Sequence, residues 1–195
     1  MAGVAAAAIV AATGALVRLH TLATGRRPVR DAVSDYGAGR HRGFYRAMVV
    51  ALGAGALLLA GGLARATDVA TGGLVWLAVY GVARIAIAFY PTDLPGAPAT
   101  VTGRIHLALA AAAFTSIAFA AAKVGGDLAG EPGWHGIGTV LQLLGIVVAA
   151  CAAATLAAAV APRARRAFGA VERALYATSM AWLLVTAVAL VVKAA

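Results

Sequence analysis

Charged residues are scarce in this sequence, and acidic residues are scarcer still. Only 12% of the 195 residues are Asp, Glu, Lys or Arg, whereas 63% are apolar and the mean hydropathy is +0.90. Soluble domains carry roughly 25% charged residues, so a chain of this composition cannot maintain a water-soluble surface. The shortage of charge excludes a soluble protein and predicts a lipid-embedded one.

Cysteine and histidine are also rare. Cys151 is the only cysteine, which excludes an intrachain disulfide. The four histidines, at positions 20, 41, 106 and 135, form no HxxxH or HExxH pair. No phosphate loop, dinucleotide fingerprint or GxSxG motif is present. We therefore predict no metal and no cofactor, although the fold can still bring His20, His106 and two aspartates together.

Long apolar segments are abundant. A membrane-spanning helix needs about 20 mostly apolar residues, and six segments meet this requirement. They are Ala2–Ala23, Tyr45–Ala64, Thr71–Tyr90, Arg104–Val124, Ile137–Ala161 and Ala174–Val192. Arg18 and His20 interrupt the end of the first segment, which lacks the positively charged start of a signal peptide. We predict an all-α, six-helix transmembrane bundle that forms one domain over residues 1–195.

Basic residues are distributed unevenly between the connections. Twelve of the 16 lie around the first, third and fifth connections, namely Arg18, Arg26, Arg27, Arg30, Arg40, Arg42, Arg46, Arg104, Arg163, Arg165, Arg166 and Arg173. Positive charge favours the cytoplasmic side, so we predict a multi-pass protein of the cytoplasmic membrane with both termini outside. The net charge of +9 is interleaved with apolar segments and does not predict a nucleic-acid partner. The Ala-rich, Arg-rich composition with few lysines is typical of a high-GC bacterial source.

Arg84 lies about six residues inside the apolar segment Thr71–Tyr90. A guanidinium group at membrane depth is costly, so it is expected to face protein or water and to have a partner. Arg84 lies roughly 10 Å below Pro91 at a rise of 1.5 Å per residue. We expect Asp35 or Asp93 to be its counter-ion.

Short polar elements cluster at the predicted cytoplasmic ends of the segments. They are Ser34-Asp35-Tyr36-Gly37, Phe89-Tyr90-Pro91-Thr92-Asp93, Thr100 to His106, and the pair Arg18 and His20. We expect Thr102 to cap the fourth helix and to place His106 in its first turn. A helix N-terminus disfavours a protonated imidazole. A neutral His106 beside Asp93 can exchange a proton or bind a metal.

Several interpretations of these residues stay open. They can form a structural network, or an intramembrane enzyme resembling a lipid hydrolase in which Asp93 and His106 activate water. The chain can also be a structural subunit that binds another membrane protein through small-residue faces. Our leading hypothesis is a pocket for a lipid head group or a small anionic ligand, with a transport or accessory role. Its candidate residues are Arg84, Asp35, Asp93, His106, Arg18, His20, Tyr36 and Thr102.

Three of these elements, in this order, resemble a known family. Ser34-Asp35-Tyr36-Gly37, Phe89 to Asp93 and Gly103-Arg104-Ile105-His106 are similar to elements of the prokaryotic membrane proteins grouped as domain of unknown function 998 (DUF998). The family typically reads Phe-Pro where this chain has Tyr90-Pro91. The resemblance covers nearly the whole chain. It implies a small multi-helix membrane protein and implies no established activity.

Overall fold

The architecture is entirely helical in the part of the chain that the structure describes. The structure is a computed structural model that describes residues 1–161 and 163–194. Helices make up 80% of it, and these residues contain no strand. The predicted all-α class is confirmed.

Six long helices and two short 3-10 helices follow one another along the chain. Their bounds are α1 Ala2–Thr21, η1 Val33–Ala38, α2 Arg42–Ala66, α3 Thr71–Ile87, α4 Val101–Gly130, α5 His135–Val160, η2 Ala164–Ala167 and α6 Phe168–Ala194. Each long helix overlaps one predicted segment. Because a proline cannot continue a helix, the prolines at 28, 91, 95, 98 and 132 all lie in connections. The largest differences from prediction are that α4 is longer at both ends and that α6 begins six residues earlier.

The helices have the length and composition of membrane spans. Among the described residues, five stretches are long and apolar enough to cross a bilayer, namely Ala2–Thr21, Arg42–Ala66, Val101–Gly130, His135–Val160 and Ala164–Lys193. The apolar helix α3 is shorter, with 17 residues, which correspond to about 25 Å. The chain is therefore a multi-pass membrane protein.

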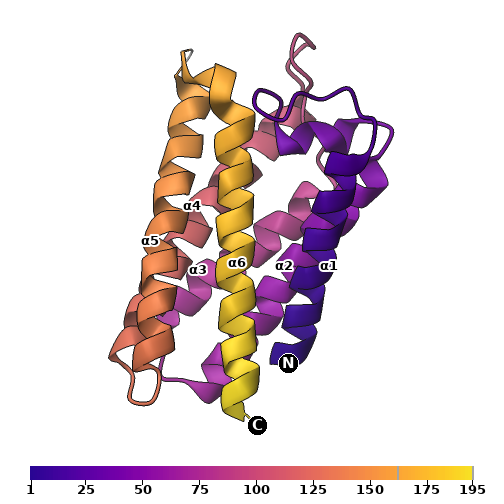
Figure 1. Cartoon of the computed structure of the whole chain (residues 1–195). Helices are drawn as coiled ribbons and strands as arrows, with labels where there is room; N and C mark the ends of the chain where they lie inside the picture. The colour runs from indigo at the N-terminus through magenta and orange to yellow at the C-terminus, as the bar shows by residue number, and fades with distance from the viewer. Residues whose placement is uncertain (162, 195) are drawn as a thin grey trace.

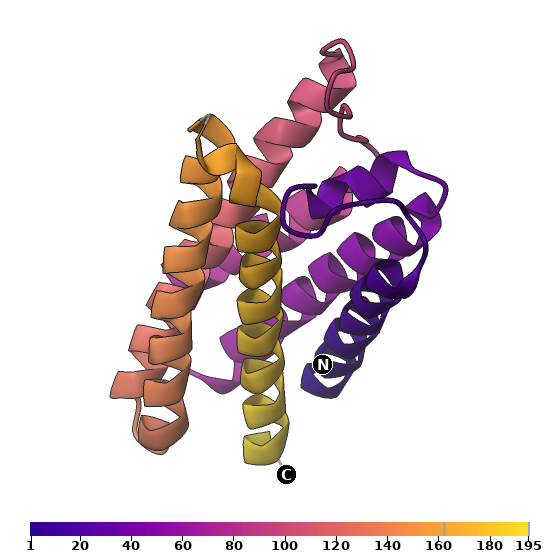
Figure 2. The ribbon, with the colours of Figure 1, turned by 45° about the horizontal axis from the view of Figure 1, so that its top comes forward.

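Consecutive helices are neighbours in space. Each of α1 to α5 packs against the next, and α6 returns to pack against α1 and α2. Figure 1 shows both termini at one end of the bundle and the first, third and fifth connections at the other. In Figure 2, the start of α4 leans away from α5 and α6 at the end that carries these connections. A cluster of buried residues draws on all six long helices, and the prediction of a single domain stays a prediction.

Helices α2 and α3 meet at two glycines. A Cβ atom added to Gly53 would lie 2.5 Å from the carbonyl oxygen of Gly81, and one added to Gly81 would lie 2.8 Å from the oxygen of Gly53. Only glycine allows two helix backbones to approach this closely. The same hypothetical Cβ of Gly53 would lie 3.1 Å from Cβ of Arg84. This crossing therefore positions the backbone of Arg84 inside the bundle.

Candidate functional site

Arg84 is buried among aromatic rings. Its side chain is 1% exposed, and its Nη1 donates a hydrogen bond of 2.7 Å to the hydroxyl of Tyr176 on α6. The guanidinium carbon lies 4.5 Å from the ring centroid of Tyr176, 5.2 Å from that of Tyr80 and 5.3 Å from that of Phe114. Cation–π contacts strengthen when the cation is desolvated. Aromatic faces from α3, α4 and α6 therefore stabilise the charge of Arg84.

Asp93 is not the counter-ion of Arg84, and this prediction was wrong. The carboxylate of Asp93 accepts hydrogen bonds of 2.8 Å from both the backbone N–H and the hydroxyl of Thr100. These two bonds lower the pKa of Asp93 below its ordinary value. A Cβ atom on Gly103 would collide with the carboxylate of Asp93, so a larger residue there would displace this side chain. Asp93 therefore organises the start of α4.

The residue that caps α4 is Thr100, which corrects the prediction of Thr102. The hydroxyl of Thr100 accepts a hydrogen bond of 3.0 Å from the backbone N–H of Gly103. Threonine at the N-cap satisfies one of the free N–H groups of the first turn. Because the cap comes two residues earlier than predicted, His106 lies beyond the first turn of the helix.

Asp35 also pairs with a residue other than Arg84. Its carboxylate lies 3.7 Å from Nη1 of Arg26, and its side chain is almost completely buried. Burial raises the pKa of the Asp35 carboxyl, and the nearby Arg26 guanidinium partly lowers it. The Arg26–Asp35 pair is the one ion pair among residues 1–161 and 163–194, and Arg84 takes no part in it.

His20 and Tyr36 contact Arg173 and stand apart from Arg84. Nε of Arg173 donates to Nε2 of His20 at 2.7 Å, and Nη2 donates to the hydroxyl of Tyr36 at 3.3 Å. Nη1 donates to the carbonyl oxygens of Pro28, Asp31 and Gly169. Arg173 therefore fastens the first connection to the start of α6.

Arg18 is exposed and donates a long hydrogen bond of 3.5 Å to the hydroxyl of Thr21 on its own helix. Arg18 is not among the residues that line a cavity with Arg84, and among the described residues it makes no hydrogen bond with Arg173. Its predicted place at the edge of the site is therefore not supported by a contact.

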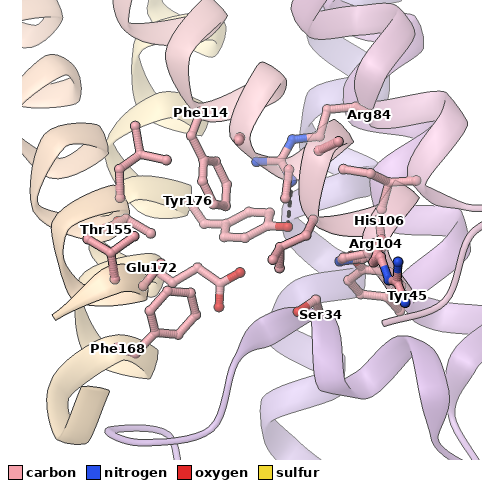
Figure 3. A pocket seen from close by; sticks show the side chains of 18 residues that line it. Ser34, Tyr45, Arg84, Arg104, His106, Phe114, Thr155, Phe168, Glu172 and Tyr176 are labelled. Atoms are coloured by element: carbon pink, nitrogen blue, oxygen red, sulfur yellow. Dashed lines mark hydrogen bonds between the residues drawn. The ribbon is translucent and has the colours of Figure 1, made fainter. Parts of the chain in front are cut away.

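Arg84 lines a cavity of about 510 Å³ between α4, α5 and α6 (Figure 3). We call it the Arg84 pocket. Most of its wall is apolar. Its polar lining residues are Ser34, Tyr45, Arg84, Arg104, His106, Thr155, Glu172 and Tyr176. The pocket thus combines a long apolar wall with a small set of convergent polar groups, which is the usual character of a ligand site.

His106 also lines the Arg84 pocket. It is 2% exposed, and its Nδ1 lies 2.7 Å from the carbonyl oxygen of Tyr90. A carbonyl oxygen only accepts, so Nδ1 carries a proton, and in the neutral ring Nε2 would be an acceptor. No hydrogen bond joins His106 to Asp93 among the described residues. The predicted proton-exchanging pair is therefore not formed.

Glu172 is a buried acidic residue of the pocket that the sequence analysis missed, as it also missed Tyr176. It is 3% exposed, and its Oε2 accepts a hydrogen bond of 2.6 Å from the backbone N–H of Val33 in η1. Figure 3 shows its carboxylate directed into the space below Tyr176. Glu172 precedes the segment predicted from Ala174 and follows an arginine-rich stretch, so it resembled a loop residue. Its spacing of four from Phe168 and Tyr176, both in the pocket lining, is the signal that identifies a shared helix face.

Arg84 and Glu172 line the same pocket without forming an ion pair. The described residues contain no Arg84–carboxylate contact within 4.0 Å. Nε and Nη2 of Arg84 have no hydrogen-bond acceptor among the described residues. Within the same residues, no group of three or more His, Cys, Asp or Glu side chains is placed to hold a metal ion. The pocket therefore presents a basic and an acidic side chain at separate positions rather than an ion pair.

Comparison with known proteins gives one match. No curated protein and no solved structure matches the chain. The model of the family described as "Protein of unknown function (DUF998)" matches residues 2–189, which is nearly the whole chain. The resemblance predicted from the Ser34, Phe89 and Gly103 elements is thereby confirmed. The chain belongs to the DUF998 family of membrane proteins.

Proposed function

We propose that this protein binds an amphiphilic membrane molecule in the Arg84 pocket, with a polar head group at Arg84 and an apolar body against α4 and α5. The observation that carries the proposal is a buried guanidinium that lines a cavity of about 510 Å³ and has two nitrogens, Nε and Nη2, without acceptors among the described residues. A buried unpaired donor costs about 1–3 kcal/mol, and more if it is charged. An anionic oxygen of a ligand would remove this cost.

The walls of the pocket support a lipid rather than a small soluble anion. Leu107 on α4 is 68% exposed and Val160 on α5 is 79% exposed, and both line the pocket. In a membrane these exposed apolar side chains face acyl chains, because the bundle is surrounded by lipid at this level. An amphiphile can therefore enter sideways between α4 and α5 and leave its chains in the bilayer.

The distribution of charge supports entry from the inner leaflet. The arginine-rich first and fifth connections share one end of the bundle (Figure 1). The pocket residues Ser34, Arg104 and Glu172 lie in the first connection and near the starts of α4 and α6. Positive charge marks the cytoplasmic side. We propose that α3 also crosses the bilayer, that the protein spans the cytoplasmic membrane six times, and that both termini are outside.

Filling the pocket tests this function. Ala111 lines the pocket from an exposed position on α4, whereas the adjacent Ala112 is exposed but does not line it. We expect the Ala111→Trp variant to lose most of the phospholipid that co-purifies with the wild-type protein, because the indole occupies the space of the ligand. The Ala112→Trp variant is the matched control and should retain it. Bound lipid is measured by native mass spectrometry after extraction in mild detergent.

Equal lipid content in all three proteins would contradict the proposal. If wild type, Ala111→Trp and Ala112→Trp carry the same lipid at the same occupancy, the Arg84 pocket is not the binding site. Both alanines are exposed, so neither substitution disturbs the buried core. Thermal unfolding of the two variants provides the check that the fold persists.

A further inference from the structure

An acidic and a basic side chain of the pocket indicate the chemistry of the head group. The inference rests on the proposed function, because it concerns the ligand of the same site. Arg84 and Glu172 are both almost completely buried, both line the cavity, and they do not pair with one another. We propose that the head group is zwitterionic: a phosphate binds at Arg84, and a protonated primary amine, two carbons away, binds at Glu172.

The positions of Arg84 and Glu172 along the axis of the bundle fit this chemistry. Glu172 precedes Tyr176 by one turn of α6, and Tyr176 bonds to Arg84. The four residues from Glu172 to Tyr176 correspond to roughly 6 Å along the helix. Because α6 starts at the arginine-rich end of the bundle, Glu172 lies nearer that end than Arg84 does (Figures 1 and 3). In an inner-leaflet phospholipid the phosphate likewise lies deeper than the terminal amine.

Glu172 and its neighbour Ser34 offer acceptors for the amine. One carboxylate oxygen is held by the N–H of Val33, and the side chain of the next residue, Ser34, lines the pocket. An ammonium group donates three hydrogen bonds and accepts none, so it can use the free carboxylate oxygen of Glu172 and the hydroxyl of Ser34. The first connection would then help to recognise the ligand.

Charge also argues against a purely anionic head group. A phospholipid with a neutral, hydroxylated head group carries a negative phosphate and no cation. It would leave the buried carboxylate of Glu172 without a positive partner inside the pocket, and a buried group without its partner is the usual basis of discrimination. Arg104 is exposed at the rim of the pocket and can contact a second phosphate oxygen of either lipid. Arg104 therefore adds affinity without selecting between the two.

Binding of matched lipids tests the inference. Phosphatidylethanolamine and phosphatidylglycerol with identical acyl chains are titrated into delipidated wild-type protein, and occupancy is measured by native mass spectrometry. We expect wild type to prefer phosphatidylethanolamine by about tenfold, the size of one charge-assisted hydrogen bond. We expect Glu172→Gln to reduce this preference below about twofold, while its amide oxygen still accepts from Val33. Glu131→Gln, in the connection at the opposite end, is the matched control and should keep the full preference.

The outcomes separate this inference from the proposed function. Equal binding of the two lipids by wild type, abolished for both by Ala111→Trp, would overturn the zwitterionic head group and leave an amphiphile site. Equal binding by wild type and Ala111→Trp would overturn both. Soluble glycerophosphoethanolamine distinguishes the source of the head group: weak competition supports a lipid, and displacement at the affinity of the lipid itself overturns it in favour of a free metabolite.

Discussion

At the scale of single residues, Arg84 shows how a membrane helix can hold a cation without a carboxylate. An arginine at the centre of a spanning helix costs about 2.5–3.5 kcal/mol on insertion scales. A desolvated cation–π contact is worth about 2 kcal/mol or more. The three rings around Arg84 and the hydroxyl of Tyr176 are therefore of the right size to offset that cost. Arg84 has partners, as we expected, but they are aromatic side chains and not a carboxylate.

Asp93 leads to a prediction about pH. Its pKa is lowered from 3.8 by hydrogen bonds from Thr100. A lowered folded pKa means that the ionised carboxylate stabilises the start of α4. This contribution is fully present above the unfolded pKa and is lost as the pH falls through the lower folded pKa. We expect carbon NMR of the Asp93 carboxyl to show a titration midpoint below 3.8 in the wild-type protein.

The cap residues supply the variants for this measurement. The Thr100→Ala substitution removes the hydroxyl donor and should move the midpoint of Asp93 upward. The Thr102→Ala substitution is the control and should leave it unchanged, because Thr102 does not cap the helix. A shift in the Thr102 variant without one in the Thr100 variant would contradict this assignment of the cap.

At the scale of helices, the bounds of α4 and α6 differ from those suggested by hydropathy because a helix need not end where its apolar segment ends. Thr100 starts α4 before the predicted segment, and α6 begins at Phe168 within an arginine-rich stretch. The additional turn of α6 places Glu172 on the same face as Tyr176. Hydropathy marks where lipid can cover a helix, whereas caps and tertiary contacts decide where it ends.

The α2–α3 crossing gives a prediction about stability. The Gly53→Ala substitution would place a Cβ atom 2.5 Å from a backbone oxygen of α3, which cannot move aside as a flexible side chain does. We expect the two helices to separate slightly and the free energy of unfolding to fall by about 1–3 kcal/mol, as for other overpacked sites. Reversible unfolding in mixed micelles measures the change.

Gly43 provides the matched control on the same helix. Nothing lies within 4 Å of a Cβ atom built there, so the Gly43→Ala variant should be as stable as wild type or slightly more stable, because alanine favours helix. Equal stability of the Gly53→Ala and Gly43→Ala variants would show that the crossing is not tightly packed in the membrane.

At the scale of the whole molecule, the bundle has two distinct ends. The first, third and fifth connections share one end, and both termini share the other (Figure 1). This geometry agrees with an even number of crossings. The pocket residues Ser34, Arg104 and Glu172 belong to the first connection and to the starts of α4 and α6, so the proposed orientation decides from which leaflet a ligand enters.

Labelling of single cysteines tests the orientation. In a Cys151→Ala background, which removes the single native thiol, we expect the Glu131→Cys variant to react with a membrane-impermeant maleimide in intact cells. The Arg30→Cys variant should react only after the membrane is opened, because its connection is proposed to be cytoplasmic. The reverse pattern would show that the protein has the opposite orientation.

Composition and hydropathy alone determined the helical membrane class, the approximate positions of the six helices and the burial of a cation at Arg84, because the cost of exposing polar groups to lipid acts on each segment separately. The three short elements that carry the family resemblance were also visible in the sequence. Asp35 and Asp93, however, proved to bind Arg26 and Thr100, which lie close to them in the chain.

Only the tertiary structure decided which groups share a cavity. It joined Arg84 to Tyr176, 92 residues away, and Glu172 to Val33, 139 residues away. Such pairs depend on the rotation of each helix about its axis and on the depth at which it crosses its neighbours. Close contacts such as that between Gly53 and Gly81 set both quantities, and neither can be read from the polarity of one segment.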